Sequence, residues 1–553
     1  MFQRFAPWTR AVRPAAVALA AVALAAACTS PGRPAQPTVS AAASGPATTL
    51  RVLAGSELAD MGPVLEAARE ATGVHVTLDY TGTLDGAQDV LDGRTTGRYD
   101  AIWFSSNRYL ALYPHAQSKL STSTPIMASP VILGLRRSVA HRLGWDARPP
   151  TWSDLAAAAS AKKLTYGMTN PAASNSGFSA LVGVAAALAG TGAALSQKAV
   201  ATVAPRLRGF FSGQTLTAGS SGWLSDAYAR RAGAGSPAGE QVDGLINYES
   251  VLLSLNASHK LHEPLTLIYP RDGVVTADYP LTLLASAAPG KSDAYRRLTA
   301  YLRRPAVQQQ IAATTHRRPL TPGVALPTTF TRAQLPPELP FPNQLGVVNA
   351  LIGAYFDKIR PPSRTIYVLD TSGSMHGARI NGLKAALTDL TGTDTSLTGQ
   401  FARFHNREQV TLLPFNTAPG QPVAFTVPAT APGPVLAQIR AVANGLHAGG
   451  NTSIYDSVEK AYGLAGTGPL TGYFTSIVLM TDGENNEGAG IDEFAAWYSR
   501  LPARLHAVPV FPILFGENNT AEMKRLASVT GGRTFDARSR SLAAAFREIR
   551  GYQ

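Results

Sequence analysis

Short apolar runs that alternate with longer helical stretches constrain the fold of the last third of this chain. The apolar runs, rich in β-branched and aromatic residues, cover residues 365–369, 410–415, 476–481 and 508–515. Stretches with helical periodicity separate them, at residues 378–391, 433–444, 453–464, 490–501 and 520–529. Apolar strands that alternate with amphipathic helices predict a mostly parallel sheet covered on both faces. In such a sheet, ligands bind beyond the carboxyl ends of the strands.

Oxygen-bearing side chains follow two of these predicted strands. The segment Asp370-Thr371-Ser372-Gly373-Ser374 comes directly after one, Asp482 comes directly after another, and the loop 449–453 adds the hydroxyl of Thr452. Carboxylates and hydroxyls without His or Cys form a hard shell, which favours Mg²⁺ first and Mn²⁺ or Ca²⁺ second. A capped turn is the alternative explanation of such a cluster. Three separate segments with this chemistry favour the metal site.

Together the three segments resemble the metal-ion-dependent adhesion site of von Willebrand factor type A (VWA) domains, over roughly residues 361 to 553. The resemblance implies that Asp370, Ser372 and Ser374 contact the metal from one loop. It also implies that Thr452 and Asp482 contact the metal directly or through water. In that family a carboxylate from a partner protein takes the open coordination position, so the implied function is metal-bridged protein binding.

Other polar residues lie near these motifs in the sequence. We expect His376 and His447 to be surface histidines and not ligands. The loop Glu484-Asn485-Asn486-Glu487 is either solvated or in contact with a partner. No nucleophile elbow, phosphate loop or metalloprotease helix occurs in the sequence, so we expect no enzymatic activity.

The N-terminus has the layout of a secretory signal. Arg4, Arg10 and Arg13 precede an apolar run from residue 15 to 27, which is too short to span a bilayer. The run ends at Cys28, the single cysteine of the chain, and this order resembles a bacterial lipoprotein signal. The family's usual leucine three places before the cysteine is Ala25 here. The resemblance implies a signal peptide over residues 1–27 and a membrane anchor on acylated Cys28; an ordinary secretory signal is the alternative.

Residues 28–48 contain Pro, Ala, Ser, Thr and Gly with almost no large apolar side chain. A segment of this composition cannot bury enough surface to order itself, so it predicts a disordered tether. Beyond it, apolar strands are predicted at residues 49–54, 74–80 and 100–106, each followed by hydroxyl-rich turns. Strand, polar turn and helix in repetition present backbone N–H groups and hydroxyls to a ligand.

The order of the segments that follow is similar to that of two-lobed solute-binding proteins of the periplasmic type. Residues 130–135 look like the hinge strand, residues 169–181 like the ligand loop and helix, and residues 247–250 like the return to the first lobe. The resemblance implies a solute-binding domain over 49–345 with its second lobe at about 128–248, a linker over 346–362 and a VWA domain over 363–553. The predicted fold class is α/β: a two-lobed binding domain followed by a doubly wound, Rossmann-like domain.

Seven residues are candidates for the cleft between the lobes: Ser56, Thr81, Ser105, Ser106, Ser174, Ser176 and Tyr248. Hydroxyls and helix N-termini without a fixed counter-charge suit a small oxyanion or a polar solute. For any one serine, helix capping is the alternative. Glu249 either lies in the cleft or pairs with an arginine outside it.

The net charge of +13 is unevenly distributed. Residues 361–553 hold 16 Lys and Arg against 15 Asp and Glu, so the excess belongs to the rest of the chain. A basic surface favours anionic neighbours such as lipid head groups. The sequence contains no basic-aromatic motif that would indicate binding to nucleic acid.

The motifs and resemblances together predict one of two functions. The first is a lipid-anchored surface protein that binds a protein partner through Mg²⁺. The second is the substrate receptor of an ABC-type importer with an accessory VWA domain.

Overall fold

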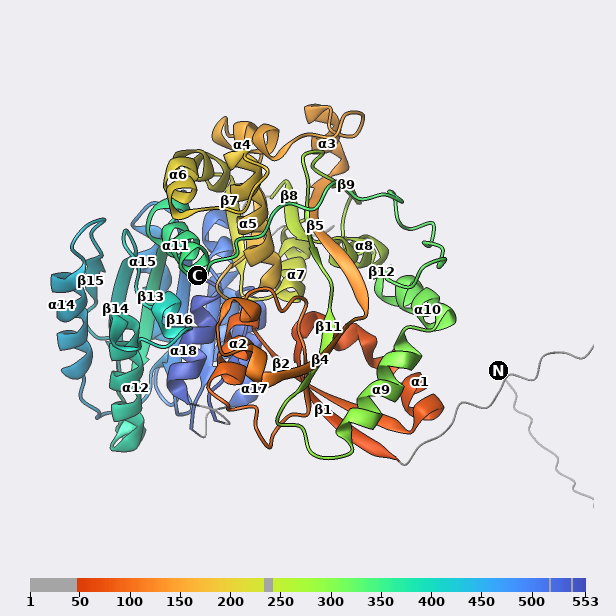
Figure 1. Cartoon of the computed structure of the whole chain (residues 1–553). Helices are drawn as coiled ribbons and strands as arrows, with labels where there is room; N and C mark the ends of the chain where they lie inside the picture. The colour runs from red at the N-terminus through yellow and green to blue at the C-terminus, as the bar shows by residue number, and fades with distance from the viewer. Residues whose placement is uncertain (1–46, 233–241, 517–518, 539–540) are drawn as a thin grey trace, which may run out of the picture. The chain divides into compact units, whose positions relative to one another are not determined.

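The strands and helices of this chain assemble into three sheets in a computed structural model that describes residues 47–232, 242–516, 519–538 and 541–553 (Figure 1). The predicted signal peptide, Cys28 and nearly all of the predicted tether lie outside the described residues.

The first sheet has the strand order β2-β1-β3-β11-β4. Strands β1, β2 and β3 are parallel, whereas β11 is antiparallel to both β3 and β4. These strands are β1 (Thr48–Gly55), β2 (Val74–Thr81), β3 (Ala101–Trp103), β4 (Leu120–Pro125) and β11 (Pro280–Leu284). The helices that pack on this lobe are α1 (Gly62–Thr72), α2 (Thr83–Leu91), α9 (Lys291–Leu302) and α10 (Pro305–Thr315).

The second sheet has the order β10-β5-β8-β6-β7, and β9 and β12 also pair with β5. Its strands are β5 (Met127–Arg136), β6 (Tyr166–Thr169), β7 (Gln214–Ala218), β8 (Gly244–Tyr248), β9 (Leu265–Ile268), β10 (Val275–Ala277) and β12 (Arg318–Pro319). Its helices are α3 (Arg137–Leu143), α4 (Trp152–Ser160), α5 (Asn175–Ala189), α6 (Gln197–Phe211), α7 (Ser221–Ala232) and α8 (Glu249–Ala257).

The chain passes from one of these sheets to the other at two places, and the second of them differs from the predicted boundary of the second lobe. The chain enters the second sheet between β4 and β5, where the hinge strand is expected. It does not return at residues 247–250, because β9 and β10 still pair with β5. The return falls between β10 and β11, so the second lobe extends about thirty residues beyond its predicted end.

The third sheet has the order β15-β14-β13-β16-β17-β18, and all its neighbours are parallel except the edge strand β15. Its strands are β13 (Ser363–Asp370), β14 (Gln409–Phe415), β15 (Val423–Thr426), β16 (Phe474–Thr481), β17 (Val510–Leu514) and β18 (Phe535–Asp536). Its helices are α12 (Ala378–Thr388), α13 (Gly399–Ala402), α14 (Gly433–Asn444), α15 (Ile454–Gly466), α16 (Ile491–Tyr498), α17 (Thr520–Val529) and α18 (Leu542–Arg550).

Side chains of the central strand β13 alternate between two apolar cores, as a sheet with two covered faces requires. Tyr367 and Leu369 pack in one core with residues of α12, α14 and α18. Ile366 and Val368 pack in the other with residues of α15, α16 and α17. The predicted doubly wound α/β architecture is therefore present.

Residues 346–362, treated as a linker in the sequence, form a packed element instead. Helix α11 (Leu345–Ala354) continues into a π-helical turn at Tyr355–Ile359. Val348, Leu351 and Ile352 are fully buried and belong to the same core as the first two sheets. The apolar spacing i, i+3, i+4 of these residues indicates a helix, but the prolines on either side obscure it.

Arg360, the residue after this π-helical turn, belongs to a buried ionic cluster. The Glu408 carboxylate, 1% exposed, accepts hydrogen bonds from Arg550 at 2.7 and 2.9 Å and from Arg360 at 3.0 Å. Its neighbour His405 is buried against the ring of Phe356, with 4.4 Å between ring centroids. These contacts join the last turn of α18 to the segment that precedes β13.

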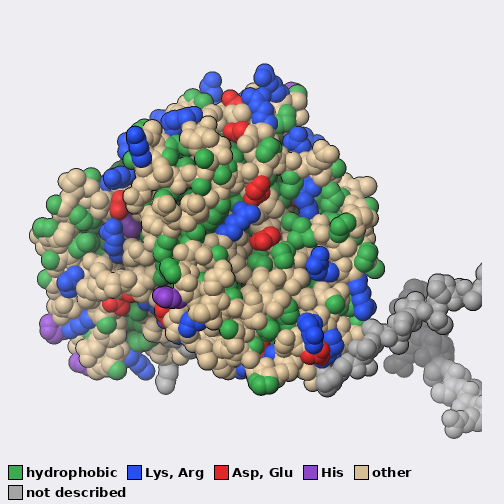
Figure 2. All heavy atoms as spheres, in the orientation of Figure 1, with side chains coloured by type: hydrophobic (Ala, Val, Ile, Leu, Met, Phe, Trp, Pro, Cys, Tyr) green, Lys and Arg blue, Asp and Glu red, His purple; other side chains and the backbone are tan. Residues whose placement is uncertain are grey.

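Figure 2 shows Lys and Arg side chains spread over one face of the molecule, densest at the top of the view. There Figure 1 places α3, α4 and α6, which belong to the second sheet. The basic excess assigned to the middle of the chain is thus visible on this lobe.

Candidate functional site

The two predicted metal-binding carboxylates lie side by side at the carboxyl edge of the third sheet. Asp370 is the last residue of β13, and Asp482 directly follows β16. Leu369 pairs with Met480 in the parallel register of these strands, so both strands end at the same level of the sheet. This is the edge where a doubly wound sheet binds its ligands.

Hydrogen bonds connect the first motif to Asp482. The hydroxyls of Ser372 and Ser374 are 3.0 Å apart, and Ser374 Oγ donates to Asp482 Oδ1 at 2.7 Å. Asp370 is fixed separately, because its carboxylate accepts from the backbone N–H of Ser372 at 2.8 Å and from Thr481 Oγ1 at 2.6 Å. Four of the five predicted ligands thus form one contiguous group.

Thr452, the fifth predicted ligand, is brought to this group by its loop. The N–H of Gly373 donates to the carbonyl of Gly450 at 2.8 Å, which ties the two loops together. A Cβ atom placed on Gly483 would lie 3.4 Å from Ser374 Oγ and 3.8 Å from Thr452 Oγ1. The two hydroxyls therefore both lie within van der Waals contact of the Cβ position of Gly483.

The loop after Asp482 has a role that sequence reasoning missed. The side-chain oxygen of Asn486 accepts from the N–H of Thr452 at 2.7 Å, and that of Asn485 accepts from the N–H of Ile454 at 2.7 Å. Asn451 Nδ2 donates to Glu487 at 2.6 Å. This loop supports the Thr452 segment, where the sequence indicated only a solvated loop or a partner contact. Two asparagines three and four residues after Asp482 were the available indication in the sequence.

The site is electrostatically suited to a cation. Asp370 and Asp482 are 0% and 1% exposed, and burial raises the pKa of Asp370, with the nearby charge of Asp482 acting in the same direction. Arg379, also missed in the sequence, places its guanidinium 2.6 Å from Asp482 Oδ2, with the side chain 35% exposed. Two buried carboxylates beside three hydroxyls therefore have one partial counter-charge among the described residues.

This donor set fits a hard dication. Within the described residues, no three His, Cys, Asp or Glu side chains converge, so any metal here depends on hydroxyl ligands as well. His376 and His447 are both exposed, as expected of surface histidines.

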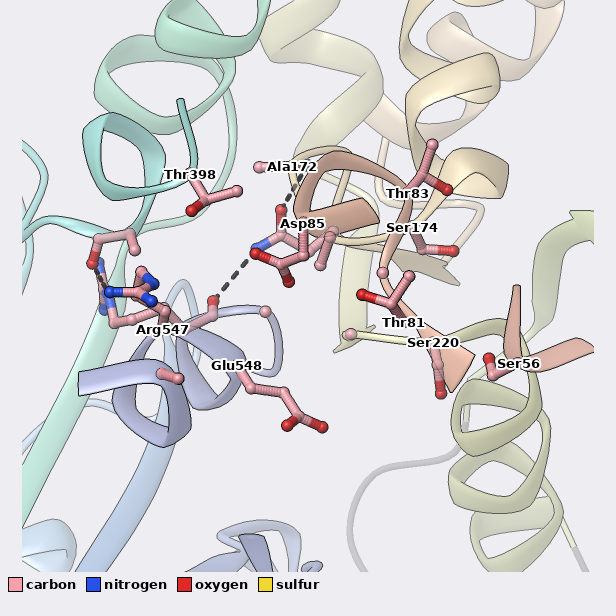
Figure 3. Close-up of a pocket in the computed structure, with 18 of the residues that line it drawn as sticks. Ser56, Thr81, Thr83, Asp85, Ala172, Ser174, Ser220, Thr398, Arg547 and Glu548 are labelled. Carbon is pink, nitrogen blue, oxygen red and sulfur yellow. Dashed lines mark hydrogen bonds between the residues drawn. The ribbon is translucent and has the colours of Figure 1, made fainter. Parts of the chain in front are cut away.

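A second candidate site is a cavity of about 590 Å³ between the two lobes built on the first and second sheets. Ser56, Thr81 and Ser174, three of the seven predicted cleft residues, line it (Figure 3). The cavity is polar on this side, since Thr83 and Ser220 add two further hydroxyls.

The other four predicted cleft residues do not line this cavity, because the lobes bury them. Tyr248 OH donates to Ser105 Oγ at 2.9 Å and accepts from Asn175, and burial raises the pKa of Tyr248 well above its ordinary value. Ser176 is 0% exposed and bonds to the hydroxyls of Thr169 and Ser221, both at 2.8 Å. Ser106 is also buried.

Glu249 lies outside the cleft, in an ion pair with an arginine. Arg318 donates to both of its carboxylate oxygens, at 2.6 and 2.7 Å, and Tyr269 donates a further hydrogen bond. Of the two possibilities left open by the sequence, the structure selects the arginine pair.

The third wall of the cavity comes from the third sheet's domain. Arg547 and Glu548 of α18 line it, together with Thr398, and Figure 3 shows them opposite Ser56 and Thr81. The side-chain amide of Asn170 donates to the carbonyl of Arg550 at 3.2 Å across this boundary. No sequence signal links these segments, which are 380 residues apart.

Charges of both signs surround the cavity. Glu57 lines it, and burial raises the pKa of this carboxyl group while the charge of Arg317 opposes the shift. Arg547 is paired with Asp394 at 3.2 Å, and Arg533 with Glu548 at 3.4 Å. The lining arginines of this wall thus have protein counter-charges, which favours a polar ligand over a strongly anionic one.

Two family models match the chain in the regions just described. Residues 50–314 match the model for a bacterial extracellular solute-binding protein, and residues 365–484 match the model for a von Willebrand factor type A domain. The chain carries a solute-binding domain and a VWA domain. The first of these indicates an extracytoplasmic location. Among the described residues, no helix combines the length and apolar character needed to cross a bilayer.

Several solved structures are also similar to parts of this chain. The periplasmic binding protein AfuA from Actinobacillus pleuropneumoniae is 11% identical with a TM-score of 0.44, over 56% of this chain and 98% of that one. The sulfate-binding protein SubI from Mycobacterium tuberculosis H37Rv is 19% identical with a TM-score of 0.38, over 50% and 89%. A von Willebrand factor type A protein from Catenulispora acidiphila is 18% identical with a TM-score of 0.28, over 34% and 42%. No curated protein matches the chain.

Proposed function

We propose that this chain is an extracytoplasmic binding protein that holds Mg²⁺ in its VWA domain and uses it to bind a carboxylate of a protein partner. The observation that supports this most strongly is the contact of Ser372, Ser374 and Asp482 at the carboxyl edge of the sheet. The proposed activity is binding and not catalysis.

Each residue of the site has a distinct part in this proposal. Asp370 and Asp482 supply the negative charge that attracts the metal, and the hydroxyls of Ser372, Ser374 and Thr452 complete a hard shell. Bound Mg²⁺ would supply the positive charge that attracts the partner's carboxylate. Asn485 and Asn486 hold the Thr452 loop in place, as outer partners of metal ligands commonly do. Mn²⁺ and Ca²⁺ are expected substitutes.

Titration of the full chain with Mn²⁺, followed by electron paramagnetic resonance, tests the metal half of this proposal. We expect one site per chain, displaced by Mg²⁺ and lost in Asp482→Ala. Asp492→Ala is the matched control, because that side chain is 84% exposed in the same domain. A folded Asp482→Ala protein that binds Mn²⁺ as tightly as the wild type would contradict the assignment.

The second part of the proposal is that the cleft binds a small polar solute. Hydroxyls from both lobes line it, and the lining charges of both signs are largely paired within the protein. Native mass spectrometry of gently purified full chain should find a small polar molecule. Thr81→Trp, which fills the cavity, should abolish that signal while Asp482→Ala retains it. No bound molecule in any preparation would count against a solute receptor.

An importer receptor is the alternative function, and the two-lobed cleft favours it. In cells that lack this chain, uptake of the identified solute should then fall, and the Asp482→Ala chain should restore it. Unchanged uptake would leave the metal-dependent partner function as the better explanation.

Membrane attachment completes the proposal. Cys28 lies outside the described residues, and we propose that it carries lipid such as palmitate and anchors the chain to the outer face of the membrane. One thioether-linked diacylglycerol supplies most of such membrane affinity, so Cys28→Ala should move the chain to the soluble fraction. A variant that stays on membranes after a salt wash would place the anchor elsewhere.

A further inference from the structure

A second cavity, of about 630 Å³, lies where the second sheet meets the VWA domain. Strand β7 and helix α7 form one side, and residues 468–476, Arg504 and residues 506–509 form the other. It meets β16 at Phe474–Ser476, the opposite end of that strand from Asp482. At about 3.3 Å per residue, the two ends of this strand are roughly 25 Å apart. The cavity is therefore separate from the metal site.

The charge of this cavity is of one sign. Its lining includes the cationic side chains Lys162, Arg230, Arg231 and Arg504, together with His506. No Asp or Glu is among the described residues that line it. This differs from the interlobe cleft, where carboxylates accompany the arginines. Several cations around a concave surface create a positive potential that attracts anions.

Two of these arginines have donors to offer a ligand. Arg230 Nη2 donates to the carbonyl of Gly531 at 3.0 Å, and Arg504 Nη2 donates to that of Gly466 at 3.4 Å. A guanidinium has five N–H donors in a planar fork that fits carboxylate, sulfonate and phosphate groups. Both side chains are exposed and line the cavity. Partial burial of the guanidinium lowers the pKa of Arg230. Because burial disfavours the charged form of this guanidinium, an anionic ligand beside it would offset that cost.

Aromatic rings form the apolar part of the lining. Trp223, half-buried, packs edge-on against Tyr552 with 5.1 Å between ring centroids and lies 6.1 Å from Phe511. The Arg230 guanidinium lies 5.5 Å from the centre of the Trp223 ring. Tyr473 and Phe474 add two more rings from the VWA side. These rings give the lining flat apolar surfaces, and the Arg230 guanidinium lies over the ring of Trp223.

We propose that this cavity binds a small organic anion with a flat, apolar body. The rings of Trp223 and Tyr473 contact the body, and Arg230 and Arg504 bind the acidic group. The volume is within the range of about 300–1,000 Å³ that small-molecule pockets occupy. The site uses neither the metal-binding residues nor the hydroxyls of the interlobe cleft, so it is independent of the proposed function.

Calorimetric titration of the full chain with three matched probes tests this proposal. Naphthalene-2-sulfonate carries both the ring and the charge, naphthalene-2-sulfonamide carries the ring alone, and inorganic sulfate carries the charge alone. We expect one saturable sulfonate site per chain, with the other two probes at least about tenfold weaker. Equal binding of the sulfonamide or of sulfate would overturn the proposal, as would the absence of saturable sulfonate binding.

Substitutions locate the site. Arg230→Gln and Arg504→Gln should each weaken sulfonate binding about tenfold, the usual effect of losing a charge-assisted hydrogen bond. Arg296→Gln is the control, because that side chain is 74% exposed on α9. Asp482→Ala should leave sulfonate binding intact, so failure of the metal proposal is distinguishable from failure of this one. Sulfonate binding that survives both cavity substitutions would refute the assignment.

Discussion

Replacing Asp370 by asparagine separates the charge of the proposed metal site from its shape. The two side chains have the same size. In the wild type the N–H of Ser372 donates to the Asp370 carboxylate at 2.8 Å, and the asparagine oxygen can accept the same hydrogen bond. Thr481 Oγ1 can accept from the new amide as readily as it donates to the present carboxylate. The fold should therefore survive, and circular dichroism should be unchanged.

If the proposed site holds Mg²⁺, the substitution should lower the affinity for the metal. The substitution removes one of two negative charges from a shell that is otherwise neutral hydroxyls, and no softer ligand compensates. Loss of an outer partner of a metal ligand typically costs about 10–100-fold in affinity, so loss of a charged ligand should cost about 100-fold or more. At a Mg²⁺ concentration of about 100 times Kd, binding adds about 2.7 kcal/mol to stability.

Two measurements check this expectation. Calorimetric titration should show the loss of Mg²⁺ affinity, and thermal unfolding should show that Mg²⁺ stabilises the wild type but not Asp370→Asn. Asp492→Asn, an exposed carboxylate in the same domain, should behave as the wild type. A folded Asp370→Asn protein whose Mg²⁺ affinity stays within about threefold of the wild type would refute the reasoning.

Three further predictions concern packing and buried charge. Gly82→Ala places a Cβ 2.8 Å from a backbone oxygen of the second lobe and should cost about 1–3 kcal/mol in thermal unfolding, whereas Gly62→Ala, with no atom within 4 Å, should cost nothing. Glu408→Gln leaves two buried arginines with a neutral partner and should cost about 3–5 kcal/mol in urea unfolding; a loss below about 1 kcal/mol would mean that the cluster is solvated. Burial lowers the pKa of His405 below the ordinary 6.5, so its neutral form contributes stability that is present above that value and lost as pH falls towards the folded pKa. Denaturation curves from pH 7 to 5 should therefore show falling stability, with a shallower slope in His405→Gln and an unchanged slope in His447→Gln.

The clustering of Asp370 and Asp482 could be predicted from the sequence because its determinants are local. Asp370 and Asp482 each end an apolar strand, and parallel pairing of the two strands is enough to bring them together. The cleft was predicted less well, because whether a hydroxyl lines a cavity depends on how closely the lobes meet. Tyr248 and Ser105 have the same local pattern as Thr81, yet the lobes bury them against each other.

Long-range contacts explain the remaining differences. Helix α18 forms a wall of the cleft through contacts with residues almost four hundred positions earlier, and no periodicity or motif carries that information. The apolar spacing within α11 is typical of a helix, but the prolines on either side of it favoured the prediction of a linker. Strands β9 and β10 were assigned to the wrong lobe because their pairing with β5 is a tertiary property.

The position of α18 also bears on how such a chain can evolve. Domains joined by a free linker can be exchanged by recombination, since each keeps its own binding surface. Here Arg547 and Glu548 of the VWA domain line the cavity of the solute-binding domain, and Arg550 bonds to Asn170. A foreign VWA domain would therefore bring different groups to the wall of the interlobe cavity. If the cavity binds a solute as proposed, substitutions in the last helix are expected to change the solute that it accepts.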